Sequence, residues 1–176
     1  MSRDYTRLRA FSAADDLVVD VYELTRGLPP DERYGLQSQI RRAAVSTPTN
    51  IVEGSVRRSD KHYLRYLESA LGSACEVRYV LGLCSRLQMR GTHECVTLIE
   101  RYTAVIKGLA ALITRIDGDL QNQRAAADGR PPKVKSRKLK APTADSRELI
   151  ALKPHPHAQL DLPRRRDGIP HPAKIR

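Results

Sequence analysis

Lysine and arginine gather in two parts of this chain, and their side chains could bind phosphate groups. One group lies near the middle of the chain and the other in its last third; the members are Arg57, Arg58, Lys61 and Arg65 in the first, and Lys133, Lys135, Arg137, Lys138, Lys140, Arg164, Arg165 and Arg166 in the second. Cations that contact the phosphates of RNA or DNA release condensed counterions, which gives salt-dependent, sequence-independent affinity. The two groups therefore predict a nucleic-acid interface. For the second group, the alternative is a solvated extension that keeps the protein soluble.

The first basic group surrounds the expected start of a helix, where the helix dipole disfavours cations. Cations at such a position favour an anionic partner. Asp60 lies among them, and Arg65 and Glu68 are spaced to form an ion pair along a helix. An ordinary charged surface is therefore the alternative interpretation of this group.

The positive charge of the chain is unevenly distributed. Residues 1–123 hold 17 basic and 15 acidic residues, whereas residues 124–176 hold 14 basic and 5 acidic residues. The high isoelectric point thus comes mainly from the last third, and by itself it does not predict that the rest of the chain binds nucleic acid.

A second set of polar residues lies beside an apolar stripe in the segment 36–54. Leu36, Ile40, Ala44, Thr47 and Ile51 recur at helical spacing, and Pro48 should bend the helix that they form. The polar residues off this stripe are Gln39, Arg42, Ser46, Asn50 and Glu53. Since Arg42 shares a helix face with Ser46 and Glu53, we predict an internal polar network rather than a ligand site.

The residue types that catalysis or metal binding would need are present, but their spacing predicts neither. Cys75, Cys84 and Cys95 lack the paired spacing of a zinc site and are expected to be reduced core residues. Glu53 and Glu76 could be paired acids, yet nothing brings them together. We found no phosphate-binding loop, nucleophile elbow or metalloprotease motif. The sequence therefore predicts a protein that is not an enzyme and has no cofactor or metal.

Four amphipathic segments should position these groups. The expected helices span about residues 13–26, 32–54, 59–88 and 92–121, with Ser12 and Ser59 as N-caps of the first and third. No stretch alternates polar and apolar residues as a strand would. The sequence therefore predicts an all-α fold, an antiparallel up-down four-helix bundle over residues 11–123, after a loose lead over residues 1–10.

The last expected helix carries more apolar surface than one neighbour would bury. Its main row comprises Ile99, Tyr102, Ile106, Leu109, Ile113, Ile116 and Leu120, and a parallel row comprises Leu98, Val105 and Leu112. The second row suggests burial against another surface, because exposed apolar patches of this size are uncommon. We therefore expect a homo-oligomer.

Residues 124–176 have a different composition. They are rich in Pro, Lys and Arg, contain no aromatic residue, and have one short apolar run at residues 149–152. Such a segment cannot bury enough apolar surface to offset the entropy cost of ordering, so a disordered basic tail is predicted. No window has the length and apolarity of a membrane span, which predicts a cytoplasmic protein that makes no membrane contact.

Several blocks of the sequence resemble one family. QIRRAAVS at residues 39–46 and NIVEG at residues 50–54 are similar to the signature of small four-helix-bundle proteins encoded in intervening sequences of bacterial 23S ribosomal RNA genes. VYELT at residues 21–25 and YLRYL at residues 63–67 agree with that signature. The accessory variability proteins of diversity-generating retroelements look similar. The resemblance extends over about residues 8–121.

The sequence departs from the family pattern at a few positions. Thr47 stands where Ile is usual, Tyr63 and Tyr66 where Phe is common, and Glu68 where Asn is frequent. These changes bear on the subfamily more than on the fold. The resemblance implies a ring-like pentamer, which the apolar pattern alone does not specify.

Taken with the basic groups, these features predict a non-enzymatic oligomeric scaffold that binds RNA, or DNA, through its basic surface and tail. The resemblance implies RNA of the ribosomal intervening-sequence type. The alternative is a protein-interaction adaptor, such as an accessory subunit of a reverse transcriptase in a diversity-generating retroelement.

Overall fold

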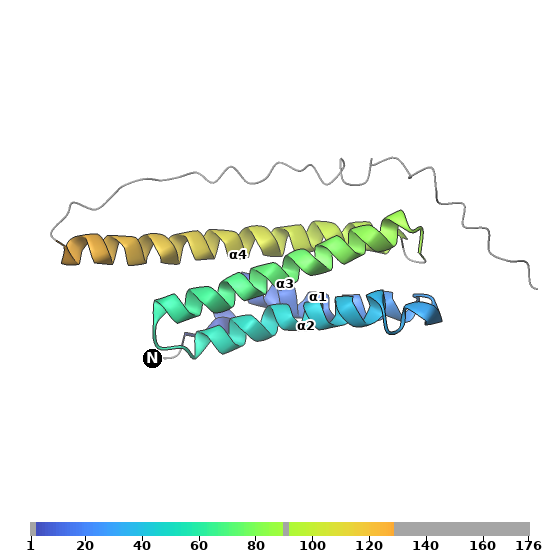
Figure 1. The fold of residues 1–176 in the computed structure, drawn as a ribbon, viewed down its shortest axis with the longest axis horizontal. Helices are drawn as coiled ribbons and strands as arrows, with labels where there is room; N and C mark the ends of the chain where they lie inside the picture. Colours follow the sequence, from blue (N-terminus) through green and yellow to red (C-terminus); the bar gives the residue numbers. More distant parts are fainter. Residues whose placement is uncertain (1–2, 90–91, 129–176) are drawn as a thin grey trace, which may run out of the picture.

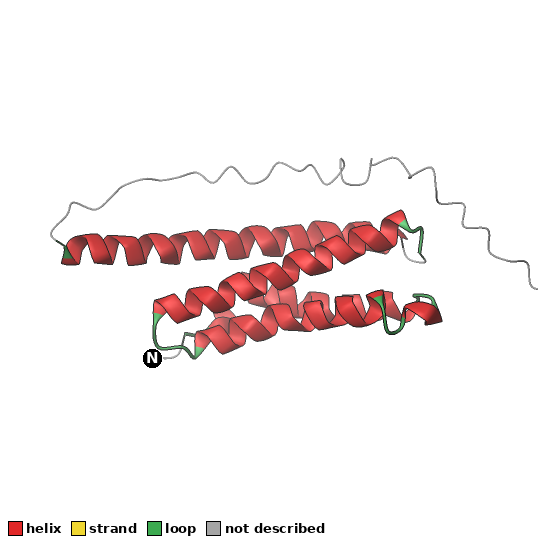
Figure 2. Cartoon of the chain, viewed as in Figure 1, coloured by secondary structure: helices red, strands yellow, loops and turns green. Residues whose placement is uncertain are grey.

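The computed structural model describes residues 3–89 and 92–128, which form four long helices and two short 3-10 helices (Figure 1). Their bounds are η1 (Tyr5–Arg7), α1 (Arg9–Arg26), η2 (Pro30–Glu32), α2 (Leu36–Ser55), α3 (Asp60–Arg86) and α4 (Thr92–Ala127). Within this part of the chain, Figure 2 shows helices and loops but no strand. The predicted all-α class with four helices is confirmed. The disordered tail was predicted over residues 124–176, but its first residues belong to α4, which continues to Ala127, and residues 129–176 lie outside the described residues.

Each long helix has two neighbours around one apolar core. α2 packs against α1 and α3, and α4 packs against α3 and α1. The largest fully buried side chains come from all four helices and include Leu17, Ile40, Ile51, Leu67, Leu81, Tyr102 and Leu109. Burial of one such aliphatic side chain contributes about 1.5 to 3 kcal/mol, so these contacts are what holds the helices together. None of the described helices is long and apolar enough to cross a membrane.

The chain is structured earlier than the sequence indicated. Asp4 caps η1 by accepting a hydrogen bond from the Thr6 N–H (3.1 Å), and the ring of Tyr5 meets Phe11 edge-on at 4.8 Å. α1 then begins at Arg9, with no side-chain cap, so the expected start at residue 13 with Ser12 as cap was wrong. The contact between Tyr5 and Phe11 explains the difference, because it fixes the chain one turn ahead of Ser12.

The start of α2 also differs from the prediction. The sequence suggested a helix from residue 32, but Pro30–Glu32 forms η2, and Gly35 has a non-helical backbone. The Glu32 carboxylate accepts a hydrogen bond from the Leu36 N–H (3.1 Å) and so serves one of the free donors at the start of α2. The separation of η2 from α2 at Gly35 was not visible in the apolar pattern.

Two residues shape the second half of α2. Pro48 lies inside the helix and is buried, while the Thr47 hydroxyl donates to the Ala43 carbonyl oxygen (3.1 Å). Gly54 was expected to end the helix, which instead continues to Ser55. A Cβ at Gly54 would lie 2.8 Å from the Tyr66 Cβ, so glycine here allows α3 to pack closely on α2.

α3 and α4 are longer than their partners. Ser59 caps α3, as predicted, and accepts a hydrogen bond from the His62 N–H (3.2 Å). α3 ends at Arg86 rather than residue 88, because Gln88 adopts a positive φ of 52°. α4 continues to Ala127 rather than residue 121, since residues 125–127 are alanine, the best helix former.

The second apolar row of α4 was the reason to expect a homo-oligomer, but most of this row is buried within the single chain. Leu98 and Val105 are buried within the single chain, and Leu112 is half-buried against the core. The second row suggested another partner only if α4 had one neighbour, but α4 packs on both α1 and α3. Among the larger apolar side chains it is Tyr34, Tyr79, Val19, Val56 and Leu87 that are most exposed.

Candidate nucleic-acid interface

The first basic group lies at the end of the bundle where α2 turns into α3, and the N-terminal segment joins it there. The Arg3 N–H donates to the Ser55 carbonyl oxygen (3.0 Å), and its guanidinium donates to the Arg57 carbonyl oxygen (2.7 Å). The same guanidinium forms an ion pair with Asp60 and lies 4.5 Å from the centre of the Tyr63 ring. Arg3 thus links three separate parts of the turn.

Arg57 is held in a second contact with an aromatic ring. Its guanidinium lies 4.6 Å from the centre of the Tyr66 ring, and its Nη2 donates a hydrogen bond of 2.5 Å to the Tyr66 hydroxyl. A cation above a ring is attracted by the quadrupole of the ring, which restricts the side chain without neutralising it. The Arg57 side chain is therefore ordered, exposed and still positively charged.

The other three predicted residues, Arg58, Lys61 and Arg65, are exposed on the same end. None of their side chains forms a hydrogen bond or ion pair with the described residues, so the suggested pair of Arg65 with Glu68 is not present. Asp60, the nearest acid in sequence to Arg58 and Lys61, is already paired with Arg3. We call Arg3, Arg57, Arg58, Lys61 and Arg65 the basic end.

The opposite end of the bundle has the opposite charge balance. Residues 3–9 and 53–68, which build the basic end, contain seven basic and four acidic residues. Residues 20–36, at the other end, contain two basic and four acidic residues. Asp20 and Glu23 there line a small pocket between α1 and α4 together with Glu94. We call this the acidic end.

α4 ends on the same side of the molecule as the turn between α2 and α3, and it reaches beyond the start of α3 (Figure 1). The second basic group lies outside the described residues; its members are Lys133, Lys135, Arg137, Lys138, Lys140, Arg164, Arg165 and Arg166.

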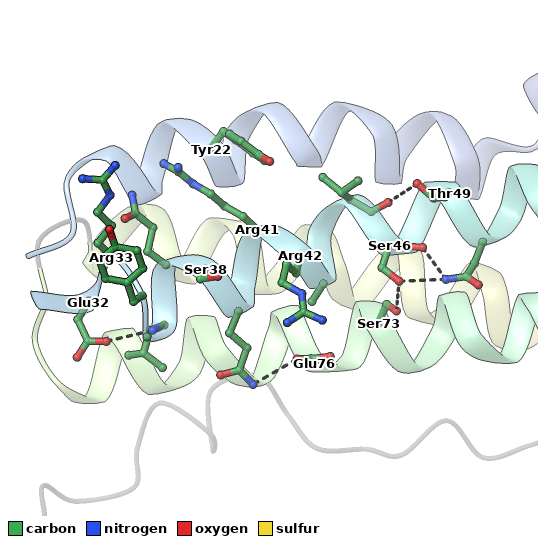
Figure 3. Close-up of a pocket in the computed structure, with 18 of the residues that line it drawn as sticks. Tyr22, Glu32, Arg33, Ser38, Arg41, Arg42, Ser46, Thr49, Ser73 and Glu76 are labelled. Atoms are coloured by element: carbon green, nitrogen blue, oxygen red, sulfur yellow. Dashed lines mark hydrogen bonds between the residues drawn. The ribbon is translucent and has the colours of Figure 1, made fainter. Parts of the chain in front are cut away.

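The predicted polar network lies along α2, and only part of it is joined by hydrogen bonds. Asn50 donates to the Ser46 carbonyl oxygen (2.8 Å), and the Ser46 hydroxyl shares a hydrogen bond of 2.9 Å with Ser73 of α3. Gln39 donates to the Glu76 carboxylate (3.2 Å) (Figure 3). The side chains of Arg42 and Glu53 are exposed and form no hydrogen bond or ion pair with the described residues.

These residues line an open groove of about 1480 Å³ that follows the outward face of α2. Arg41 also lines this groove, although it was not among the predicted site residues. The Arg41 Nε donates to the Thr25 hydroxyl (2.7 Å), and its guanidinium lies 4.7 Å from the centre of the Tyr22 ring. Arg41 is thus used to join α2 to α1. Arg3 was missed too, although the pattern Asp4, Tyr5, Thr6 could have indicated a capped turn before α1.

The three cysteines are free thiols, and Cys75 is only half-buried, although a core position was predicted for it. Cys84 and Cys95 are both buried. Burial, with smaller contributions from the Cys84 thiol and the Glu94 carboxylate, raises the pKa of the Cys95 thiol to about 11. Burial also raises the pKa of Cys84. Both groups are therefore protonated near neutral pH, when a nucleophile or metal ligand would need the thiolate. Among the described residues, no three metal-ligating side chains come together.

The fold and this surface define a small helical-bundle protein with cations concentrated at one end. The sequence profile of the 23S rRNA-intervening sequence protein family matches residues 6–111, more than half of the chain, and the chain belongs to that family. The matched range contains four of the five residues of the basic end, but neither Arg3 nor the tail. A comparison with curated proteins gives no match.

Proposed function

We propose that this protein is a non-enzymatic scaffold that binds RNA through its basic end and its tail. The observation that carries the proposal is that Arg58, Lys61 and Arg65 are exposed, with no counterion among the described residues, at the end of the bundle where α4 ends. The name of the family, which refers to ribosomal RNA intervening sequences, supports RNA as the nucleic acid.

The rings beneath the cations support the same proposal. Tyr66 holds Arg57 in a fixed position, so this guanidinium loses less freedom when it contacts a phosphate. Arginine held on an aromatic ring also presents a flat face on which an unpaired base can stack. The basic end therefore offers both charge and stacking surface.

We also propose that copies of the chain associate, and the family resemblance suggests five. Association would place several tails, each with 14 basic and 5 acidic residues over positions 124–176, on one particle. Weak contacts of each tail would then add through effective concentration. A light-scattering mass above that of one chain is the expected result, and the mass of a single chain at all concentrations would contradict association.

RNA retention in gel shifts at increasing salt tests the RNA proposal. The full-length protein is expected to bind a single-stranded RNA at about 50 mM salt and to lose affinity steeply by about 200 mM. A chain that lacks residues 129–176 should bind more weakly but still detectably, because the basic end remains. Absence of binding at low salt would contradict the proposal. Equal affinity of the two proteins would show that the tail does not contribute to RNA binding.

A further inference from the structure

The exposed apolar side chains of the bundle lie mainly on the outer surface of α1 and α2. Seven large apolar side chains are exposed among the described residues, and five of them lie on these two helices or directly beside α2, namely Val19, Tyr22, Tyr34, Val45 and Val56. Exposed apolar surface that is gathered in one region favours contact with another protein. The outer surface of α1 and α2 is therefore the first place to look for a protein partner.

The outward face of α2 carries a stripe of exposed residues, which we call the α2 stripe. Its members recur at helical spacing and are Arg42, Val45, Thr49, Glu53 and Val56. All but Val56 line the groove of Figure 3. Neither Arg42 nor Glu53 forms a hydrogen bond or ion pair with the described residues. The stripe thus begins with a free cation and has a free carboxylate near its end.

The outward face of α1 carries a similar stripe, which we call the α1 stripe. Its members are Arg9, Ser12, Asp16, Val19 and Glu23, all exposed and separated by steps of three or four residues. Arg9 forms no hydrogen bond or ion pair with the described residues. The Glu23 carboxylate accepts a hydrogen bond from Arg26 through one oxygen (2.8 Å) and can accept another through its second oxygen. This stripe also runs from a cation to an acid.

From these two stripes we infer that the α1 stripe of one copy packs against the α2 stripe of the next copy, with the two helices antiparallel. The inference rests on the proposed self-association and gives it a contact surface. Because each stripe runs from a cation to an acid, the antiparallel arrangement brings Glu23 of one copy to Arg42 of the next. One turn further along, Val19 then meets Val45, since both stripes advance by three or four residues per turn.

The other end of the two stripes matches in the same register. Ser12 of the α1 stripe falls opposite Glu53 of the α2 stripe, and Arg9 falls within one turn of the same carboxylate. A hydroxyl and a guanidinium can both donate hydrogen bonds to a carboxylate. The contact thus has an ion pair near each end and two valines between them.

A contact between two different surfaces is head-to-tail, so it repeats from copy to copy. α1 and α2 are neighbours in the bundle, so their outward faces point about 90° apart rather than in opposite directions. Each added copy is therefore turned relative to the previous one, and the series closes into a ring instead of growing straight. A ring of five, which turns by about 72° per copy, needs a turn of similar size.

All copies in such a ring point the same way. α1 and α2 run antiparallel within one chain, because the Gln37 side chain donates to the Thr25 carbonyl oxygen (2.8 Å) and the Arg3 N–H donates to the Ser55 carbonyl oxygen (3.0 Å). An antiparallel contact between α1 of one copy and α2 of the next therefore keeps both copies in one orientation. The basic ends then lie on one face of the ring, where several of them can contact the same RNA.

The composition of the groove favours a protein partner over a nucleic acid. Its charged residues are three arginines and three glutamates, namely Arg33, Arg41, Arg42, Glu32, Glu53 and Glu76. Surfaces that bind nucleic acid are much more positive than this. Tyr34 and Tyr22, which also line the groove, are 87% and 38% exposed. Tyrosine and arginine are enriched among the residues that dominate binding between proteins.

Charge reversal in the full-length chain tests the contact. Arg42→Glu alone places two glutamates opposite each other, and Glu23→Arg alone places two arginines there. Each variant should weaken self-association about tenfold or more, measured by sedimentation over a range of concentrations. The double variant Glu23→Arg, Arg42→Glu should associate like the unchanged chain, because it restores the pair in reverse. Glu100→Arg and Arg115→Glu on α4 make the same changes outside both stripes and should leave association unchanged.

The outcomes separate this contact from self-association as such. All the changed positions are exposed, so circular dichroism should show equal helix content. An effect of Arg42→Glu without one of Glu23→Arg, or no recovery in the double variant, would overturn the contact between the two stripes and leave self-association standing. Single chains at all concentrations for the unchanged protein would overturn both. Loss of RNA retention by Arg42→Glu with unchanged mass would assign the groove to nucleic acid and also overturn the inference.

Discussion

The two ends of the bundle are built from the same four helices, but they differ in which titratable side chains are exposed and which are buried. At the basic end, Arg58, Lys61 and Arg65 are exposed and unpaired. Near the acidic end, Cys84, Cys95 and Tyr102 are buried in the interior, and the acids lie outside. Exposed charge without a counterion favours binding of a partner, whereas a buried group with a raised pKa makes the stability of the fold depend on pH. The basic end is therefore where a partner should bind. Most of the buried groups with a raised pKa lie near the acidic end, with Tyr63 at the basic end as the exception.

The largest expected effect comes from charge reversal at the basic end. The triple variant Arg58→Glu, Lys61→Glu, Arg65→Glu should weaken RNA binding about 100-fold or more near 0.1 M salt, because three cations that face phosphates become anions. Fluorescence anisotropy with a labelled single-stranded RNA measures this. Arg86→Glu at the acidic end is the control and should change affinity less than threefold. Equal losses of RNA affinity in the two variants would show that the basic end and the acidic end do not differ in RNA binding.

Alkaline pH should destabilise the fold through the groups near the acidic end. The Cys95 thiol has an ordinary pKa of 9.0 and a pKa of about 11 in the folded chain, mainly because of burial. Because the pKa is higher in the folded chain than in the unfolded chain, the unfolding free energy is unaffected below pH 9. It falls by about 2 to 3 kcal/mol as the pH rises from 9 toward 11. Urea unfolding at pH 7 to 11 measures the decline. Cys95→Ala should lower stability at neutral pH but flatten the decline; an equally steep decline in that variant would contradict the assignment.

Packing at the basic end should depend on Gly54. A Cβ there would lie 2.8 Å from the Tyr66 Cβ and 3.0 Å from the Tyr63 ring, so Gly54→Ala forces α2 and α3 apart. We expect a loss of about 1 to 3 kcal/mol in unfolding free energy. Gly72→Ala is a matched control, because no atom beyond the adjoining backbone of α3 lies within 4 Å of its Cβ position, and it should stabilise α3 by up to about 1 kcal/mol. Equal effects of both changes would mean that the helices do not approach closely at Gly54.

The smallest effect is expected at Tyr102. Its side chain is fully buried, and its hydroxyl has no hydrogen-bond partner among the described residues. Burial, with the Asp20 carboxylate, raises the pKa of this hydroxyl, so it stays protonated in the fold. Tyr102→Phe removes an unsatisfied polar group and should leave stability unchanged or raise it by about 1 kcal/mol. A loss of more than about 1 kcal/mol in urea unfolding would show that the hydroxyl does have a partner.

The sequence predicted the four helices and the apolar stripe of α2 because helical spacing is a local property. Ile40, Ala44, Thr47 and Ile51 are all buried, and Ser59 caps α3. The start of α1 was missed because it depends on a contact between Tyr5 and Phe11 that pattern alone does not reveal. The burial of Leu98 and Val105 was misjudged for a similar reason, since spacing does not show how many neighbours a helix has.

For the candidate site, the sequence showed that four of its cations lie close together but not how they are held. Arg57, Arg58, Lys61 and Arg65 are close in sequence, so their common location followed from one turn. Arg3 is more than fifty residues away from them, and its ion pair with Asp60 depends on tertiary structure. The pairing of Arg57 with Tyr66 likewise required the geometry of the turn.

The salt dependence of RNA binding tests most directly whether the basic end contacts phosphates. Affinity should be measured for the full-length protein and for the triple variant Arg58→Ala, Lys61→Ala, Arg65→Ala at several salt concentrations. If these three side chains each neutralise one phosphate of a single strand, the slope of log affinity against log salt should become shallower by about 2 in the variant. Two parallel slopes would contradict the account, because they would show that none of the three cations meets a phosphate.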